Sequence, residues 1–400
     1  MKVAFIDLLS QQREIAEGVK SGWEKVISTS SFIGGPFVKE FESAYASRTG
    51  VSHCIGVANG TDAMELCLRA VEVGPGDEVI LPANSFVATA EAVARVGAVP
   101  VVVDVDPEHL LIDPDHVAAA ITKRTKAIVP VHLFGQTAPV EMLQPIANAH
   151  GLVIIEDAAQ SQGATRHGRP AGSLGTLAAT SFYPGKNLGA YGDAGAVLTN
   201  QADLARRIRM LGAHGSEIKY VHEFLGFNSR LDALQAVVLT EKLKRLNVWN
   251  ARRREAARRY SELLSNVSAL KLPRSANGNE DVWHLYVVRL KERDKALADL
   301  QSAAIGTGVH YPLPIHKTPA FESLAKVGPG GCKIAERAAE EILSLPLCPY
   351  ITAEAQHYVA DVLAKTVTRQ SAARATRRKA PIAAVSGGEF TGMTPQISLS

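Results

Sequence analysis

The segment Val153-Ile-Ile-Glu-Asp157-Ala-Ala-Gln160 is a run of apolar residues that ends in two acids. Such a run predicts a strand covered on both faces inside a parallel sheet, because a half-exposed strand would alternate apolar and polar residues. A carboxylate at the end of such a strand costs several kcal/mol to bury unless a cation or hydrogen bonds compensate it. Asp157 is therefore either a structural acid, in a helix cap or a buried salt bridge, or the counter-charge of a cationic ring nitrogen.

Similar apolar runs lie on both sides of this segment and alternate with helical patterns. Strands are expected at Cys54–Ala58, Glu78–Pro82, Val99–Val103, Ala127–Val131, Leu152–Glu156, Ala178–Phe182 and Ala196–Thr199. The clearest helices are expected at Asp62–Ala70, Ser85–Val96, Pro139–His150 and Gln201–Leu211. This repetition predicts an α/β fold with a mostly parallel sheet and helices on both faces, whose ligands bind beyond the carboxyl ends of the strands.

A smaller α+β unit follows the sheet. Residues 231–264 form one long charged helical pattern, in which arginines are interleaved with acids and apolar residues. That pattern favours a solvated connecting helix over a nucleic-acid-binding stripe. A strand at Trp283–Leu290 and helices at Asp294–Ala303 and Ile334–Ile342 come next.

These patterns divide the chain into a large domain over residues 1–245, a small C-terminal domain over 246–368 and a basic, disordered tail over 369–400. The N-terminal segment either stays with the large domain or packs on the small one. The tail holds five basic residues and one acid, a net charge of +4, which leaves −1 for the rest of a chain whose total is +3. The folded part is thus close to neutral, which argues against nucleic acid as a partner.

Several further classes lack support in the sequence. The four cysteines stand far apart, without the spacing of a metal site, and are expected to be free thiols in a reducing compartment. An acid at position 7 comes too early for a signal peptide, and no apolar run reaches the ~18 residues of a membrane span. We expect a cytoplasmic protein that binds neither membranes nor a metal.

Two glycine-containing segments at strand ends could carry chemistry, whereas the usual dinucleotide, P-loop and zinc-protease motifs are missing. Gly60 and Thr61 stand where the first strand turns into a helix, whose free N–H groups favour a phosphate. Thr or Asp at this place is also an ordinary helix cap. Lys186 lies in a glycine-rich turn among aromatic and small residues, and a desolvated lysine there becomes a nucleophile toward carbonyls.

A phosphate cradle, an anionic partner for a pyridinium and a Schiff-base lysine are together what pyridoxal 5′-phosphate (PLP) requires. Asp157 would keep the ring nitrogen protonated, and Gln160 could hydrogen-bond the ring hydroxyl. Ser181, five residues before Lys186, could reach the phosphate.

The ordered series of motifs resembles the DegT/DnrJ/EryC1/StrS family of PLP-dependent sugar aminotransferases. The segments that carry the resemblance are Asn59–Ala63, Glu156–Gln160, Ser181–Gly189, Gly192–Gly195 and Gly226–Arg230. The resemblance implies the fold-type I aminotransferase architecture and a homodimer whose active sites are shared between subunits. It also implies transfer of an amino group from L-glutamate to a keto-sugar nucleotide.

The resemblance also suggests roles for further residues. Phe86 matches the aromatic residue that stacks on the cofactor ring, and Asn228 the residue that reaches the phosphate from the neighbouring subunit. The segments around His132 and Lys186 resemble members that aminate C-3 of dTDP-linked 3-keto-6-deoxyhexoses. Substrate-site candidates are Tyr183, Arg230, His310, Tyr311 and His316, although His316 could equally be a core histidine and Tyr311 a packing aromatic.

The expected mechanism is a ping-pong cycle in which Lys186 also moves protons. One alternative is an enzyme of the same fold that acts at C-4 or on a keto-cyclitol. Another is a non-catalytic regulator that retains the fold, which the presence of Lys186, Asp157 and Thr61 disfavours.

Overall fold

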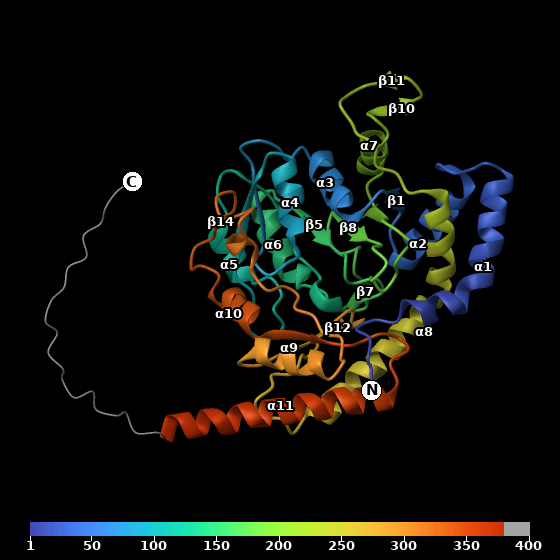
Figure 1. Ribbon diagram of the computed structural model, residues 1–400. Helices are drawn as coiled ribbons and strands as arrows, with labels where there is room; N and C mark the ends of the chain where they lie inside the picture. The colour runs from blue at the N-terminus through green and yellow to red at the C-terminus, as the bar shows by residue number, and fades with distance from the viewer. Residues whose placement is uncertain (380–400) are drawn as a thin grey trace, which may run out of the picture.

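An eight-stranded sheet forms the centre of the molecule, which a computed structural model describes over residues 1–379, with side chains over 1–369 (Figure 1). The strand order is β1-β9-β8-β5-β4-β2-β3-β14. Only β9 runs against its neighbours, and the other pairs are parallel. The bounds are β1 His53–Val57, β2 Glu78–Pro82, β3 Val99–Val103, β4 Thr125–Ile128, β5 Val153–Asp157, β8 Leu177–Ser181, β9 Gly195–Thr199 and β14 Lys326–Val327.

Helices cover both faces of this sheet, as the apolar runs predict. The helices on one face are α3 Gly60–Ala70, α4 Val87–Arg95 and α7 Ala202–Gly212, and those on the other are α2 Gly35–Thr49, α5 Pro114–Ala120, α6 Val140–His150 and the first half of α8 Ala233–Leu264. Neighbouring residues of one strand enter opposite cores: Ala178 packs with α2 and α8, and Ala179 with α3 and its neighbours. All seven predicted strands of the sheet are confirmed.

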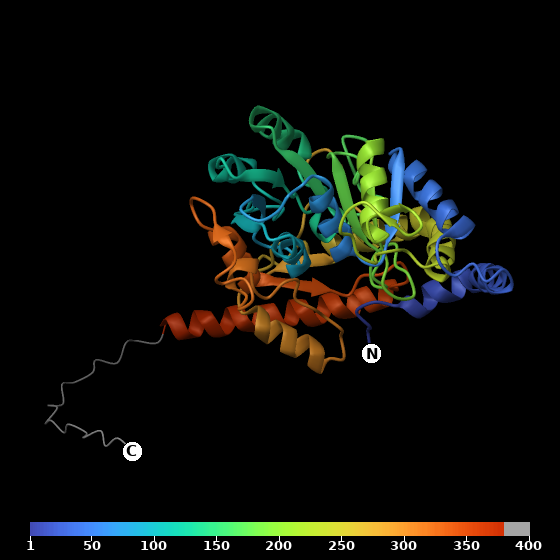
Figure 2. The ribbon, with the colours of Figure 1, turned by 90° about the horizontal axis from the view of Figure 1, so that it is seen from above.

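The two N-terminal helices, α1 Leu8–Ser28 and α2, are not among the elements that the sequence predicts. The first packs on α8 beside α2. Its start is fixed by Asp7, whose carboxylate accepts a hydrogen bond of 3.0 Å from the Ser10 N–H. Both helices lie at one side of the sheet (Figure 2).

A second core belongs to the C-terminal unit. The unit contains β13 Tyr286–Arg289 paired with β15 Ile342–Leu345, and the helices α9 Arg293–Ser302, α10 Lys333–Glu341 and α11 Ala353–Lys379. Helices α9 and α11 pack in this second core, whereas the buried residues of α10 pack in a core of the large sheet. The second core also contains Val3, which pairs with Ile305, so the N-terminal segment packs on this unit. The expected boundary at 245/246 falls inside α8, which runs unbroken from one core to the other.

The expected tail starts as helix. Helix α11 continues to Lys379, so it includes the first part of the expected tail, residues 369–379 (Figures 1 and 2). Alanine and arginine dominate this stretch, and both are strong helix formers. Residues 380–400 of the expected tail lie outside the described part of the chain.

Short elements complete the described chain. They are the turns η1 Leu133–Gly135 and η2 Ile315–Lys317, the hairpin β10 Ser216–Ile218 with β11 Val221–His222, and the small sheet β12 Asn279–Glu280, β6 Thr165–Arg166 and β7 Arg169–Pro170. The β10–β11 hairpin projects away from the body (Figure 1). Within the described residues, no helix is long and apolar enough to cross a bilayer.

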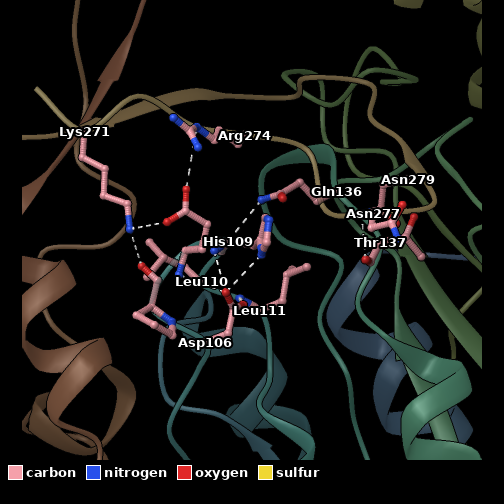
Figure 3. A network of polar contacts seen from close by, with 12 residues as sticks. Asp106, His109, Leu110, Leu111, Gln136, Thr137, Lys271, Arg274, Asn277 and Asn279 are labelled. Carbon is pink, nitrogen blue, oxygen red and sulfur yellow. Dashed lines mark hydrogen bonds and ion pairs between the residues drawn. The ribbon is translucent and has the colours of Figure 1, made fainter.

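A polar network ties the loop after β3 to the segment that leads into β13 (Figure 3). Asp106 accepts a backbone hydrogen bond of 2.7 Å from His109, whose carbonyl accepts one of 3.2 Å from the Gln136 amide. Lys271 lies 2.8 Å from the Glu108 carboxylate and donates to the Pro107 carbonyl at 2.6 Å. The contacts of Lys271 connect the C-terminal unit to this loop.

Candidate active site

A cavity of about 770 Å³ lies at the carboxyl ends of the central strands, between the sheet and the C-terminal unit. Ten of the predicted site residues line it: Gly60, Thr61, Phe86, Asp157, Gln160, Ser181, Tyr183, Lys186, His310 and Tyr311. Motifs that lie up to 251 residues apart in the sequence, from Gly60 to Tyr311, therefore meet in one place, as the parallel topology predicts.

The amino end of α3 forms one wall of the cavity. Asn59 caps this helix by accepting a hydrogen bond of 2.8 Å from the Asp62 N–H, so Thr61 is not the cap. Among the described residues, the Thr61 hydroxyl has no hydrogen-bond partner, and N–H groups of the first turn lack acceptors within the helix. The helix end is thus free to bind an anion.

Two glycines allow this wall to form. A Cβ on Gly60 would lie 2.6 Å from Cβ of Ser181, and a Cβ on Gly195 would lie 2.4 Å from the Asn59 carbonyl oxygen. The missing side chains let α3 start directly against β8 and β9. The result is a cradle with Ser181 at its edge, and its free N–H donors and hydroxyl groups fit a phosphate group.

Asp157 enters the cavity from the end of β5. Its Oδ2 accepts a hydrogen bond of 2.7 Å from Thr89, and its Oδ1 accepts one of 3.2 Å from the Ala159 N–H. It forms no ion pair with the other described side chains and caps no helix. Neither structural alternative for this carboxylate therefore applies, and it remains available to a cationic ligand.

Glu156, its neighbour, has a purely structural environment. The carboxylate is fully buried and accepts hydrogen bonds of 2.7 Å from the N–H groups of Gly172, Leu174 and Gly175. It also lies 2.7 Å from Nε2 of His132. Successive residues of a strand point to opposite faces, which separates the structural acid from the one in the cavity.

Lys186 stands near Asp157 in a hydrogen-bonded turn. Its N–H bonds the Tyr183 carbonyl at 2.8 Å, and a Cβ on Gly189 would lie 2.4 Å from the Pro184 carbonyl oxygen, so the turn depends on that glycine. Burial lowers the pKa of Lys186 from 10.5 to about 8, although nearby Asp157 acts in the opposite direction. A substantial fraction of this amine is therefore neutral near pH 8.

Aromatic and amide side chains form the wall facing the turn. The ring centroids of Phe86 and Tyr311 lie 5.4 Å apart, and Phe86 is 54% exposed because it borders the cavity. Gln160 donates a hydrogen bond of 3.1 Å to the Tyr311 hydroxyl and accepts one of 2.7 Å from the Phe134 N–H. One N–H of the Gln160 amide thus remains for a ligand.

His284 is a cavity residue that the sequence does not single out. The predicted strand starts at Trp283, but β13 begins only at Tyr286, which leaves His284 in the preceding segment at the cavity wall. Burial lowers its pKa well below 6.5, and the charges of Lys186 and Arg253 act in the same direction. No local sequence signal distinguishes such a histidine from a core residue.

Three candidates lie outside this cavity. His316 is buried in η2 with Nε2 2.9 Å from Glu336, so its placement supports the core alternative rather than a substrate contact. Asn228 and Arg230 are exposed on the segment that follows the β10–β11 hairpin. Neither contributes to the cavity of its own chain.

Comparison with known proteins agrees with this geometry. Residues 13–364 match the model of the DegT/DnrJ/EryC1/StrS aminotransferase family. A "pleiotropic regulatory protein" of Geobacillus stearothermophilus is 45% identical, over 91% of this chain and 98% of that protein. The dTDP-3-amino-3,4,6-trideoxy-α-D-glucose transaminase of Streptomyces venezuelae is 42% identical, over 88% of this chain and 92% of that protein.

Two solved structures superpose on almost the whole fold. DesV of S. venezuelae, in complex with a ketimine intermediate, has a TM-score of 0.89 at 41% identity, covering 92% of this chain and 98% of its own. NtdA of Bacillus subtilis, with bound cofactor PMP, has a TM-score of 0.82 at 35% identity, covering 89% and 82%. The α/β aminotransferase fold is thereby confirmed, and the chain belongs to the DegT/DnrJ/EryC1/StrS aminotransferase family of PLP-dependent sugar aminotransferases.

Proposed function

We propose that this protein is a PLP-dependent aminotransferase that moves an amino group from L-glutamate to C-3 of a dTDP-linked 3-keto-6-deoxyhexose. The observation that carries the proposal is the placement of Lys186, Asp157 and the amino end of α3 around one cavity. The likeness to the S. venezuelae transaminase supports the sugar class and the carbon position.

The residues of the cavity fit the cofactor. The cradle of Gly60, Thr61 and Ser181 would hold its phosphate, and Phe86 would lie against its ring. Asp157 would stabilise a protonated ring nitrogen, since its carboxylate has two neutral donors and no cationic partner among the described residues. Bound there, PLP supplies an electron sink for negative charge at the substrate carbon.

Lys186 performs the proton transfers in this proposal. Its Nζ is the amine that would hold the aldehyde group of the cofactor between turnovers. The free amine, with a pKa lowered to about 8, takes the proton from Cα of glutamate. In the second half-reaction Lys186 delivers a proton to the sugar carbon, which completes a ping-pong cycle.

We also propose a homodimer with shared sites. The segment 218–225 exposes large apolar side chains, with exposed fractions of 69% for Ile218, 80% for Tyr220 and 94% for Leu225. Such a patch on a projecting hairpin is typical of an interaction surface. A second copy seated on it would bring Asn228 and Arg230 toward a neighbouring cavity. Leu225→Asp should shift the sedimentation equilibrium toward monomer and lower activity together. A monomeric mass for the original protein would contradict the dimer, and an unchanged dimeric mass for the variant would contradict an interface at this hairpin.

The central test is substrate turnover with matched lysine variants. Purified protein reconstituted with PLP should convert 3-keto but not 4-keto dTDP-hexoses, and glutamate alone should yield one equivalent of 2-oxoglutarate. Lys186→Ala and Lys186→Arg should both bind PLP without the absorbance of the lysine adduct and without turnover. Turnover restricted to 4-keto sugars or keto-cyclitols would replace the carbon assignment.

The alternative function is that of a non-catalytic regulator. It is favoured by the name of the 45% identical relative, a "pleiotropic regulatory protein". It predicts that PLP produces no lysine-dependent absorbance and that glutamate releases no 2-oxoglutarate.

The cytoplasmic location stays a prediction, and fractionation of the native host would test it.

A further inference from the structure

Two histidines border the cavity, and a buried polar partner holds one nitrogen of each ring. Nδ1 of His284 lies 3.2 Å from Oδ1 of Asn187, and Nδ1 of His310 lies 2.8 Å from Oγ of Ser344. Both histidines line the cavity, and neither Nε2 has a hydrogen-bond partner in the described part of the chain. The proton of each neutral ring can sit on either nitrogen, and the partner of Nδ1 determines which one.

The Asn187 amide fixes the proton of His284. Its Nδ2 donates hydrogen bonds of 2.9 Å to the Val282 carbonyl and 3.0 Å to Oδ1 of Asn250. Because a carbonyl can only accept, the amide cannot be flipped, and Oδ1 must face the imidazole. An oxygen acceptor requires a donor, so the proton of His284 sits on Nδ1 and Nε2 carries a lone pair.

The Ser344 hydroxyl fixes His310 in the opposite way. Ser344 is fully buried on β15, and its backbone bonds Gly308 in both directions, at 2.8 Å and 3.2 Å. Nδ1 of His310 is the only hydrogen-bond partner of this hydroxyl among the described residues. A buried hydroxyl without an acceptor is unfavourable, so Ser344 donates, Nδ1 accepts, and Nε2 of His310 carries the proton.

Packing keeps the His310 ring in place. Phe5 stacks on it with centroids 5.8 Å apart and planes 16° from parallel. A Cβ on Gly308 would lie 2.8 Å from Cε1 of the ring, so only glycine leaves room for it. Burial, with the charge of Lys186, lowers the pKa of His310 to about 4, and that of His284 lies well below 6.5. Both rings are therefore neutral at pH 7.

We propose that His284 and His310 are locked in opposite neutral tautomers, so that the cavity presents one bare ring nitrogen and one ring N–H to the sugar. A sugar hydroxyl donates to His284, and a second sugar oxygen accepts from His310. Asn187 and Ser344 are positioning residues that act through the two rings. The identity of the ligand rests on the proposed function, whereas the tautomers do not.

Imidazole nitrogen NMR tests the tautomers directly, with and without PLP. His132 is an internal reference, because its Nδ1 accepts from the Ala138 N–H at 3.0 Å and its Nε2 must then donate to Glu156. The variants His284→Gln and His310→Gln assign the two signals. We expect His310 to match His132 and His284 to show the reverse pattern; the same tautomer in both rings, or a doubly protonated ring at pH 7, would overturn the proposal.

Kinetics of Ser344→Ala test the role of the pair. The His310 signal should become a mixture of tautomers, and KM for the keto-sugar should rise about 10-fold, the equivalent of one hydrogen bond. The glutamate half-reaction should stay within twofold, and Ser344→Thr, which keeps the hydroxyl, should restore KM. Ser261→Ala is the matched control, since it removes a hydroxyl 2.9 Å from Tyr286 in the same unit.

The outcomes separate the two proposals. Equal losses in both half-reactions of Ser344→Ala, or an unchanged KM beside a changed tautomer, would overturn sugar recognition by the pair. A different outcome is that no keto-sugar is turned over while the spectrum shows opposite tautomers. This outcome would refute the proposed function but leave the tautomer assignment valid.

Discussion

The hydroxyl of Thr89, on α4, donates a hydrogen bond of 2.7 Å to Asp157 at the end of β5. Ser85 in turn lies 2.7 Å from the Thr89 hydroxyl, so a short chain of hydroxyl groups ends on the carboxylate. This chain fixes the orientation of Asp157 without neutralising its charge. A cationic ring nitrogen can then supply the missing positive partner.

Thr89→Val should weaken PLP binding about 10-fold, because it removes one hydrogen bond to a charged group and keeps the shape of the side chain. Thr89→Ser, which retains the hydroxyl, is the control and should stay within twofold of the original protein. Spectroscopic titration of the apoprotein with PLP measures both affinities. Equal affinity for Thr89→Val and Thr89→Ser would mean that this hydrogen bond does not support the cofactor.

The cradle at α3 gives a second test. Gly60→Ala places a methyl group 2.6 Å from Cβ of Ser181 and must push α3 away from β8. We expect PLP affinity to fall at least 10-fold, with a smaller loss of thermal stability. Gly74→Ala is the matched control, because its nearest contact would be 4.0 Å away. Similar PLP affinities for the two variants would show that the helix end does not bind the phosphate.

The sequence predicts the sheet and the lysine turn because both depend on local patterns. Apolar runs determine buried strands, and parallel strands bring Gly60, Asp157 and Lys186 to one edge whatever their separation along the chain. Helix α1 is not predicted because its apolar residues are sparse and gain burial only through tertiary contacts, most of them with α8.

The remaining site residues depend on tertiary contacts. Side chains alternate between the two faces of β5, so only one of the adjacent acids Glu156 and Asp157 can face the cavity. The sequence of the pair alone does not reveal which one it is. His284 enters the cavity because the Asn187 amide holds its ring, a contact across 97 residues. His316 lies in a motif that resembles a substrate-binding segment, yet its ring pairs with Glu336 on α10.

The pKa of the Lys186 amine determines how the rate of PLP capture should depend on pH. With a pKa of about 8, the neutral fraction rises roughly tenfold between pH 7 and pH 9, and the rate of lysine adduct formation should rise with it. Stopped-flow absorbance of the apoprotein measures this rate. In Asp157→Asn the profile should move to lower pH, because the lost negative charge no longer favours protonated Lys186; a shift to higher pH would contradict this electrostatic coupling.

The buried charge of Lys242, away from the cavity, should lower the free energy of unfolding. It is only 4% exposed on α8, its Nζ lies 4.9 Å from the centroid of the Tyr191 ring, and it forms no ion pair with the described residues. Burial lowers its pKa from 10.5 to about 8, so between these values the unfolded chain binds more protons than the folded one. The penalty of Lys242 is therefore full below pH 8 and shrinks as the pH rises toward 10.5.

Lys242→Met should consequently raise the Tm of the apoprotein by a few degrees at pH 7, corresponding to about 1–3 kcal/mol, and the gain should diminish toward pH 10. Scanning calorimetry across this range compares the variant with the original chain, so that the similar contribution of Lys186 cancels. Lys244→Met, on the same helix but 60% exposed and paired with Glu241, is the control and should change Tm little. A lower Tm for Lys242→Met at pH 7 would mean that the contact with Tyr191 outweighs the cost of burying the charge.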